Sequence, residues 1–312
     1  MVRLGLIGCG EHSEIGHVLP LARYRKTHPH EIALTAACDL QLARAELFRT
    51  KYGFERTYID VDEMLAREKL DGCIIVVPSG QISALGIKLL KTGIPCVVEK
   101  PLGSTLAEVQ ALREAAETTG TPNMVSVNRR FMPFLNAALE WTRSVGTIQY
   151  VHCTMARHAR IEPQFIWETA VHSVDSLRYI CGEVGGFSVR RLNEAQAGAA
   201  YGIDLTFKNE SAGRIDVLPT AGMVEETYDL FGEKFRVTVT SPFGPQRGWR
   251  ALHKGKVVKE EAVTADMPED EVFGFYAEAS ALVYALGKGK KLEPTIADVA
   301  PSVELCMAVA SQ

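Results

Sequence analysis

A glycine-rich turn near the amino terminus is the first feature of the sequence that can do chemistry. Residues 5–13 read GLIGCGEHS, with Gly8 and Gly10 in a G-x-G pattern and Ser13 where a dinucleotide turn has its third small residue. Such a turn lets the backbone approach a pyrophosphate, and the following helix points N–H groups at the anion. We interpret it as a dinucleotide site; a purely structural turn is the alternative.

Asp39 closes the next apolar run after this turn. A carboxylate at this place accepts hydrogen bonds from both ribose hydroxyls of NAD and repels the 2′-phosphate of NADP. The sequence therefore favours NAD, with NADP as the second choice. Asp39 is also a candidate cap for a helix that starts at Leu40, and both roles can hold together.

Lys100 stands in Glu99-Lys100-Pro101, directly after the apolar run 95–98. A lysine at the carboxyl end of a buried parallel strand points into the crevice where doubly wound folds bind ligands. Its ammonium can donate to a substrate oxygen and stabilise the negative charge that develops during hydride transfer. The alternative is a solvated surface lysine.

His172 lies on a predicted helix over residues 168–181. One stripe of this helix is polar, and it holds Glu168, His172, Asp175 and Tyr179. A polar stripe on an otherwise apolar helix is typical of a cleft lining, where a histidine acts as general acid or base and carboxylates orient it. A solvent-facing charged stripe is the alternative.

Two further side chains are candidates for substrate contacts. Arg157 ends the strand before that helix and either clamps a carboxylate, phosphate or sugar or forms an ion pair with Glu162 or Glu168. Trp167, together with Phe165, is either an apolar platform for a sugar ring or part of the core.

Metal-ligand patterns are not evident in the sequence. His12 and His17 have no Cys, Asp or Glu beside them at ligand spacing, so we interpret both as surface or loop residues and expect no metal. The seven cysteines are scattered without a C-x-x-C pair and are predicted to be buried thiols.

Three short motifs follow one another along the chain: Glu99-Lys100-Pro101, Asn128-Arg129-Arg130-Phe131 and His172-Ser173-Val174-Asp175. Together they resemble the EKP, N-x-R-F and GxHxxD-type signatures of the Gfo/Idh/MocA family of NAD(P)-dependent oxidoreductases. The resemblance covers essentially the whole chain. Two positions depart from it, because Glu168 replaces the aspartate of the family's sugar and polyol dehydrogenases and Ile82 replaces a common histidine.

The resemblance, combined with the residues themselves, implies a set of roles. Catalysis is expected from Lys100, His172 and Glu168, and substrate contacts from Lys100, Arg157, Trp167, His172 and Asp175. The residues expected to bind the cofactor follow predicted strands: Gly8, Cys9, Gly10, Glu11, His12, Asp39, Leu40, Val77, Pro78, Ser79, Gln81, Glu99, Lys100 and Asn128.

The elements that must position these groups change near residue 128. Before it, continuously apolar runs alternate with amphipathic stretches, as in a parallel sheet covered on both faces. The predicted strands are 3–7, 32–38, 72–77, 95–98 and 123–127, and the predicted helices are 14–26, 40–52, 60–67, 81–91 and 105–118, the last capped by Ser104.

Beyond residue 128 we predict a helix over 133–143, a strand over 147–157, the His172 helix, successive strands over 187–263 and helices over 272–286 and 297–310. A turn at Lys254-Gly255 favours antiparallel pairing. The fold class is therefore α/β: a Rossmann dinucleotide-binding domain over 1–125 and an α+β domain with a mainly antiparallel open sheet over 126–312, which binds substrate and forms oligomers.

Composition excludes several classes of protein and of binding partner. The 312 residues are 46% hydrophobic and 23% charged, which is typical of globular proteins and excludes disordered or collagen-like classes. The net charge of −4 without a Lys/Arg block argues against nucleic acid. No apolar stretch approaches the roughly 20 residues of a membrane helix, and no signal-peptide pattern is visible, so a cytoplasmic location is expected.

We therefore expect an NAD-preferring dehydrogenase that moves a hydride between nicotinamide and a carbinol carbon of a sugar, polyol or related small molecule. The alternatives are a reductase of another carbonyl, imine or double bond, and a non-catalytic NAD-binding sensor. An antiparallel sheet with one uncovered face also predicts a homodimer or homotetramer.

Overall fold

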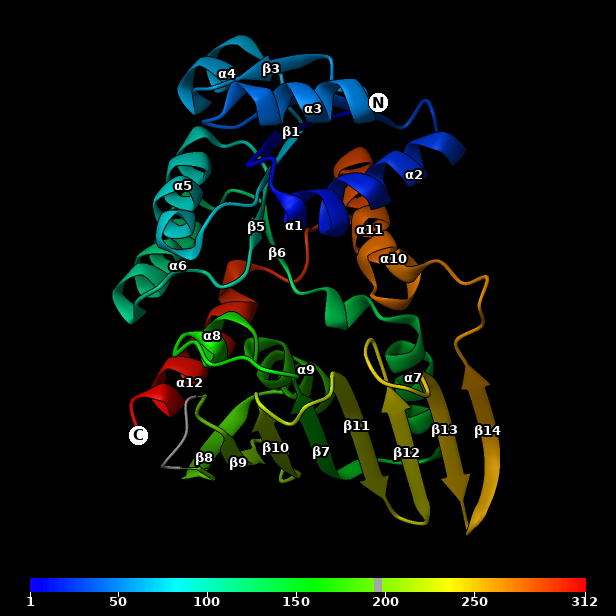
Figure 1. The fold of residues 1–312 in the computed structure, drawn as a ribbon. Helices are drawn as coiled ribbons and strands as arrows, with labels where there is room; N and C mark the ends of the chain where they lie inside the picture. Colours follow the sequence, from blue (N-terminus) through cyan, green and yellow to red (C-terminus); the bar gives the residue numbers. More distant parts are fainter. Residues whose placement is uncertain (194–197) are drawn as a thin grey trace. The chain divides into compact units, whose positions relative to one another are not determined.

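The computed structural model describes residues 1–193 and 198–312, which form two compact units (Figure 1). The first unit comprises Met1–Val127 and Phe275–Glu304, and the second comprises Asn128–Gly274 and Leu305–Gln312. The units differ from the predicted domains 1–125 and 126–312 in one main respect. Residues 275–304, which we had placed in the second domain, fold with the first.

The first unit is built on a parallel sheet in the order β3-β2-β1-β4-β5-β6. Its strands are β1 (Val2–Ile7), β2 (Ile32–Cys38), β3 (Arg56–Tyr58), β4 (Gly72–Ile75), β5 (Cys96–Glu99) and β6 (Asn123–Ser126). This is the Rossmann order, which reverses between β1 and β4, and ligands bind outside the carboxyl ends of the strands at that point. The predicted Rossmann fold is confirmed.

The helices of this unit follow the predicted pattern with local differences. They are α1 (Glu11–Ser13), the π-helix η1 (Glu14–Val18), α2 (Leu19–Thr27), α3 (Leu42–Tyr52), α4 (Val61–Arg67), α5 (Ser79–Thr92), α6 (Leu106–Thr119), α11 (Phe275–Lys288) and the first part of α12 (Ile296–Ala310). Thr105, not Ser104, caps α6, because Thr105 and Glu108 form a reciprocal capping box.

The return of the chain to the first unit has a physical reason. Helix α11 packs against α2 and β1, so it covers apolar surface that an isolated first half would leave exposed. The amide of Val125 donates to the Pro294 carbonyl at 2.7 Å. Asn123 Oδ1 also accepts from the Ile296 amide at 2.8 Å. Pro294 and Ile296 thus form hydrogen bonds with polar groups of the edge strand β6.

The second unit is built on a mainly antiparallel sheet, as predicted. Its order is β14-β13-β12-β11-β7-β10-β9-β8, and only the β7–β10 pair among the described strands is parallel. The strands are β7 (Ile148–Ala156), β8 (Val184–Arg191), β9 (Tyr201–Phe207), β10 (Ala212–Leu218), β11 (Glu225–Gly232), β12 (Phe235–Thr240), β13 (Gly248–His253) and β14 (Lys256–Ala262). The predicted turn at Lys254-Gly255 joins β13 and β14, with φ of 51° and 77°.

Helices cover one side of this sheet. The unit contains the 3₁₀ turn η2 (Asn128–Phe131), α7 (Pro133–Val145), α8 (Phe165–Glu168), α9 (Val171–Cys181) and α10 (Glu269–Val272). Helix α7 contacts β12 and β13, and α9 contacts β7 and β10. Strand β10 alternates accordingly: Ile215 and Val217 are buried, whereas Arg214 and Asp216 between them are partly exposed.

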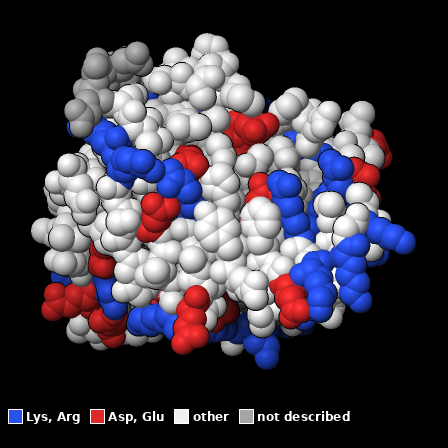
Figure 2. Space-filling model, turned by 90° about the horizontal axis from the view of Figure 1, so that it is seen from below, with Lys and Arg blue, Asp and Glu red and all other residues white. Residues whose placement is uncertain are grey.

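The surface mixes both signs of charge. On the face seen in Figure 2, basic and acidic side chains lie interspersed with uncharged ones. None of the helices in the described part of the chain is long and apolar enough to cross a membrane.

A buried ion cluster lies inside the second unit. Glu226, fully buried on β11, accepts hydrogen bonds from Arg129 Nε at 3.0 Å and Nη2 at 2.7 Å, and another from Arg157 Nη2. Burial alone would raise the pKa of Glu226, but the two guanidinium groups outweigh it and lower that pKa. One carboxylate therefore balances two cations from different segments of the chain.

Replacing Glu226 by Ala should lower the free energy of unfolding by about 3–5 kcal/mol, because two buried guanidinium groups lose their counter-charge. Urea unfolding followed by circular dichroism measures this change. The matched control is Glu260→Ala, which breaks an exposed pair with Arg250 at 3.5 Å and should cost less than about 1 kcal/mol. Equal effects of the two substitutions would show that the cluster is not a structural centre.

Candidate active site

The glycine turn after β1 leaves room for a ligand. Gly8 has φ +91°, and a Cβ there would lie 1.9 Å from the Val76 carbonyl oxygen, so the position requires glycine. Gly10 has an ordinary extended backbone, and a Cβ there would meet nothing within 4 Å. The turn therefore presents open space in front of Gly10, as a pyrophosphate cradle needs.

Ser13, in place of the usual third small residue, serves the turn directly. Its side chain is buried, and its Oγ accepts a hydrogen bond from the Gly10 amide at 3.4 Å. Helix α1 begins at Glu11, three residues before the helix start we predicted, and passes into the π-helix η1 at Glu14. The turn thus leads straight into a helix N-terminus, the arrangement that favours an anion.

Asp39 joins the end of β2 to this turn. Its Oδ2 accepts from the Cys9 amide and its Oδ1 from the Gln41 amide, both at 2.8 Å. It does not cap α3, because that helix starts at Leu42 and Gln41 occupies the cap position. Each carboxylate oxygen still has a lone pair for a ribose hydroxyl.

Of the other positions expected at the cofactor, some lie at the carboxyl edge of the sheet and others are exposed or belong to the second unit. Pro78 occupies the N-cap position of α5, and the Gln81 amide donates to the Pro78 carbonyl at 2.8 Å, so the segment after β4 forms a defined turn at the carboxyl edge of the sheet. Leu40, by contrast, is 83% exposed. Asn128 belongs to the second unit, where its Nδ2 donates to the Phe273 carbonyl at 2.8 Å.

Lys100 follows β5, whose neighbour β4 pairs with β1. The carboxyl ends of these parallel strands share one edge of the sheet, so the lysine lies on the same edge as the glycine turn. Lys100 is half-buried. This partial burial favours the crevice position over a fully solvated surface lysine.

Glu99, the residue before this lysine, is a buried carboxylate between two histidines. His17 Nε2 lies 3.1 Å from Glu99 Oε2, and His12 Nε2 lies 3.4 Å from Oε1. Burial alone would raise the pKa of Glu99, but the two imidazoles outweigh it and hold that pKa well below its ordinary value. The expectation that both histidines are surface or loop residues is wrong for His17, which is only 6% exposed.

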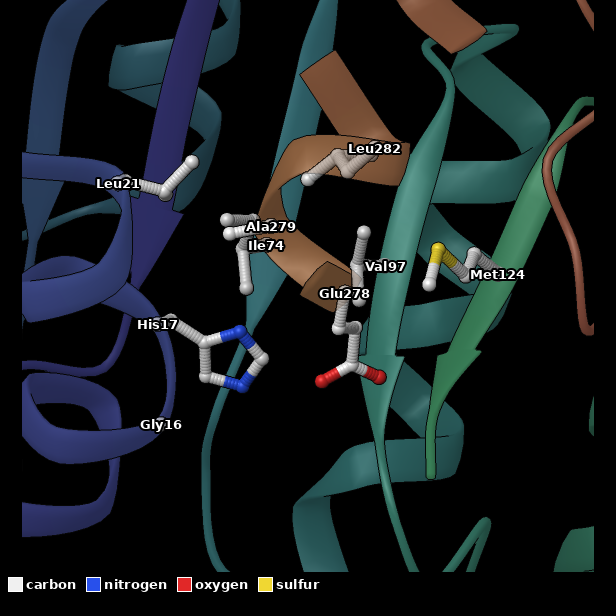
Figure 3. Close-up of a pocket in the computed structure, with 9 residues that line it drawn as sticks. All are labelled: Gly16, His17, Leu21, Ile74, Val97, Met124, Glu278, Ala279 and Leu282. Carbon is white, nitrogen blue, oxygen red and sulfur yellow. The ribbon is translucent and has the colours of Figure 1, made fainter. Parts of the chain in front are cut away.

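A second buried carboxyl, Glu278 of α11, faces the same place. Figure 3 shows the His17 ring and the Glu278 carboxylate directed toward a shared space whose other walls include Ile74, Val97 and Met124. Ser126 Oγ donates to Glu278 Oε2 at 3.1 Å. Burial, with the nearby Glu99 charge, raises the pKa of Glu278 well above its ordinary value. Sequence patterns missed this residue because it lies far along the chain.

His172 lies in the second unit, in the first turn of α9, and is 7% exposed. The single helix over 168–181 that we predicted is wrong. Thr169, with φ −121° and ψ −49°, ends α8 just after Glu168, and α9 starts at Val171. Glu168 and His172 therefore belong to separate helices, and the continuous polar stripe does not exist.

Asp175 is held by an arginine. Arg130 donates from Nε to Asp175 Oδ2 at 2.8 Å and from Nη2 to Oδ1 at 2.7 Å. The two residues therefore form a bidentate ion pair. Asp175 is 1% exposed. Both of its oxygens thus face Arg130, a residue of the N-x-R-F motif to which the sequence assigned no role. A role for Asp175 in orienting His172 stays a prediction.

Arg157 is 6% exposed and pairs with Glu226, not with Glu162 or Glu168 as the alternative had it. Glu162 instead pairs with Arg160. Of the two aromatic candidates, Phe165 is core, whereas Trp167 is partly exposed. The buried indole Nε1 of Trp167 has no hydrogen-bond partner within residues 1–193 and 198–312. A substrate contact by Trp167 stays a prediction.

Comparison with known proteins assigns a family to the first part of the chain. The model of an oxidoreductase family with an NAD-binding Rossmann fold, GFO_IDH_MocA, matches residues 2–128. Residues 2–128 belong to the Gfo/Idh/MocA oxidoreductase family. The resemblance carried by Glu99-Lys100-Pro101 is confirmed for this part of the chain. The glycine turn with open space at Gly10 and the carboxylate of Asp39 fit the NAD that this family binds.

Curated relatives include two carbohydrate dehydrogenases. D-apiose dehydrogenase of Paraburkholderia graminis is 30% identical over 207 residues, which are 62% of this chain and 54% of that protein. Myo-inositol 2-dehydrogenase of Thermotoga maritima is 26% identical over a segment that covers 76% of this chain and 74% of the length of that enzyme. This chain thus spans about half the length of the first relative.

Solved structures show that the likeness in fold extends over the whole chain. A dehydrogenase from Chromobacterium violaceum has a TM-score of 0.86 at 17% identity, covering 100% of this chain and 95% of the other. Both units of the present chain therefore share the fold of the Chromobacterium violaceum dehydrogenase. At 17% identity, this match shows a common fold and nothing about function.

Replacing Gly10 by Ala should weaken NAD binding at least tenfold while leaving the melting temperature unchanged. The new methyl group meets no protein atom within 4 Å, so only a molecule bound over the turn would feel it. Isothermal titration calorimetry with NAD measures the affinity. Gly287→Ala is the control, because its Cβ would make an ordinary contact with Val2 at 3.5 Å. Unchanged NAD affinity in Gly10→Ala would place the cofactor elsewhere.

Proposed function

We propose that this protein is an NAD-dependent dehydrogenase that moves a hydride between nicotinamide and a carbinol carbon of a sugar, polyol or related compound. The observation that carries the proposal is the half-buried Lys100 at the carboxyl end of β5, on the same sheet edge as the glycine turn and Asp39. Relatives named for apiose and myo-inositol support the substrate class.

The first unit supplies the cofactor residues in this proposal. Gly8 and Gly10 admit the pyrophosphate, and Asp39 accepts from the ribose hydroxyls. Its negative charge disfavours a 2′-phosphate, so NAD is preferred over NADP. When bound, the nicotinamide supplies the acceptor or donor of the hydride.

Lys100 and His172 divide the chemistry at the substrate. The Lys100 ammonium donates to the substrate oxygen and stabilises the negative charge that develops on it. In the oxidative direction, His172 takes the hydroxyl proton, the C–H bond electron pair leaves as hydride and a carbonyl forms. Glu168 and Asp175 act as positioning groups for His172, and Arg157 and Trp167 contact the remainder of the substrate.

Replacing Lys100 by Ala or His172 by Asn should lower kcat/KM by at least about 100-fold, because each removes a group that acts in the transition state. NADH absorbance with a panel of sugars, polyols and inositols measures turnover. Lys91→Ala and His30→Ala, at exposed positions of the same chain, are the matched controls and should keep the full rate. Full activity of both active-site variants would remove these two roles.

The same panel separates the alternatives. NADH consumption with a carbonyl, imine or activated double bond, and none with any alcohol, would favour a different reductase. Tight NAD binding without turnover on alcohols, keto acids or these acceptors would instead favour a sensor. Dehydrogenation of a sugar or polyol supports the proposal against both.

We propose further that the protein is a cytoplasmic homodimer or homotetramer joined through the sheet of the second unit. Helices α7 and α9 pack on one side of this sheet. Arg214, Asp216 and His152 are partly exposed on its strands and pair with one another. All seven cysteines, none of which falls in 194–197, are buried free thiols, as expected in a reducing compartment.

Light scattering should give a mass of at least twice the 34.2 kDa of one chain at micromolar concentration. The reason is that a broad open sheet face is stabilised by a second copy. Arg214→Glu reverses the charge on this face and should shift the equilibrium toward monomer, whereas Lys91→Ala should not. A wild-type protein that is monomeric throughout would contradict this proposal.

A further inference from the structure

We propose that His12, His17 and Glu99 form a site for one divalent transition-metal ion of the Zn²⁺ type. The three potential ligand atoms lie within 4.8 Å of one another. Two imidazoles and a carboxylate are an established donor set for zinc. His12 and Glu99 also belong to the residues expected at the cofactor, but metal binding by these side chains does not depend on hydride transfer.

The distances between the donor atoms suit a tetrahedral ion. With metal–ligand bonds of about 2.0–2.1 Å, two ligands at the tetrahedral angle lie about 3.3–3.4 Å apart. His12 Nε2 and His17 Nε2 are 3.4 and 3.1 Å from the two oxygens of Glu99. Each histidine nitrogen thus lies at a tetrahedral ligand spacing from one Glu99 oxygen, and all three ligand atoms lie within 4.8 Å of one another.

The π-helix explains how two histidines five positions apart face one carboxylate. In an α-helix, residues five apart point about 140° away from each other. A π-turn, with its i→i+5 hydrogen bonds, brings such residues to within about 50° of one another. The π-helix η1 starts two residues after His12 and contains His17, and both Nε2 atoms face Glu99. Single π-turns inside α-helices are frequent at functional sites.

Glu278 supplies an independent sign of a missing ligand. Its Oε1 is buried and has no hydrogen-bond partner in the described part of the chain. Together with His17 it lines the small pocket of Figure 3. A buried carboxylate oxygen without a partner is costly, and an ion bound by His17 and Glu99 would be its natural neighbour. Glu278 itself lies outside the group whose ligand atoms are within 4.8 Å of one another, so the proposed donor set remains two imidazoles and one carboxylate.

The site also has an entry path and a mechanical consequence. The His12 side chain is 49% exposed, so an ion can reach the cluster from solvent. His12 and His17 belong to the helix after the glycine turn, whereas Glu99 ends β5 and precedes Lys100. A bound ion would tie these elements together and restrict the backbone that carries the lysine.

Metal binding to the full chain tests the proposal without any activity assay. Tag-free protein is stripped with a chelator and titrated with Zn²⁺ by calorimetry and with Co²⁺ by visible absorption, since a tetrahedral Co²⁺ site gives intense d–d bands. We expect one ion per chain with tetrahedral bands. Absence of binding at micromolar metal would overturn the proposal, as would weak octahedral bands.

Variants assign the site to these residues. His12→Ala and Glu99→Gln should weaken binding by at least about 100-fold, because even loss of an outer-shell partner costs about 10–100-fold. His30→Ala, an exposed histidine of the same unit, should bind the ion like the wild type. His12 is partly exposed, so His12→Ala keeps the test valid if Glu99→Gln fails to fold. Unchanged affinity in folded His12→Ala would overturn the assignment.

Discussion

The buried carboxylate of Glu99 is the constraint on which the site of the first unit depends. A buried charge is unfavourable unless cationic or hydrogen-bonding groups surround it, and here His12 and His17 do so. To present both rings, the helix after the glycine turn adopts a π-turn. The same carboxylate ends β5 and immediately precedes Lys100, so the helix that follows the cofactor turn and the strand that carries the lysine are connected through one side chain.

The second unit uses the same principle with opposite charges. Glu226 is buried between Arg129 and Arg157, and Asp175 holds Arg130. Arg129 and Arg130 are adjacent in η2, yet their guanidinium groups bind carboxylates on different elements. This segment is therefore anchored to β11 and to α9, the helix that carries His172. The N-x-R-F motif acts in the structure as a two-sided anchor.

The parts of the fold that sequence patterns predicted are those set by local chemistry. The strand 32–38 was predicted with its observed bounds, and the glycine turn, Asp39 and Lys100 were placed at strand ends because parallel strands share their carboxyl edge. The three-residue β3 was missed since so short a run has no period of its own. The return of residues 275–304 to the first unit was missed because it rests on contacts between distant segments, such as α11 with β1.

Distance along the chain also explains why the candidate site was only partly foreseen. Glu99 is 82 positions from His17, so a search for ligands at short spacing excluded a cluster that the sheet assembles. The opposite error occurred at Glu168, where a spacing of four was taken as a shared helical face although helix α8 ends at Glu168 and Thr169 caps it. The orientation of Glu168 is consequently set by the α8–α9 junction and not by helical periodicity. At that junction the His172 amide donates to the Thr169 carbonyl at 3.2 Å. Glu168, with one methylene more than the aspartate of the sugar and polyol dehydrogenases that the chain resembles, is therefore the last residue of a short helix, next to the turn that separates α8 from α9.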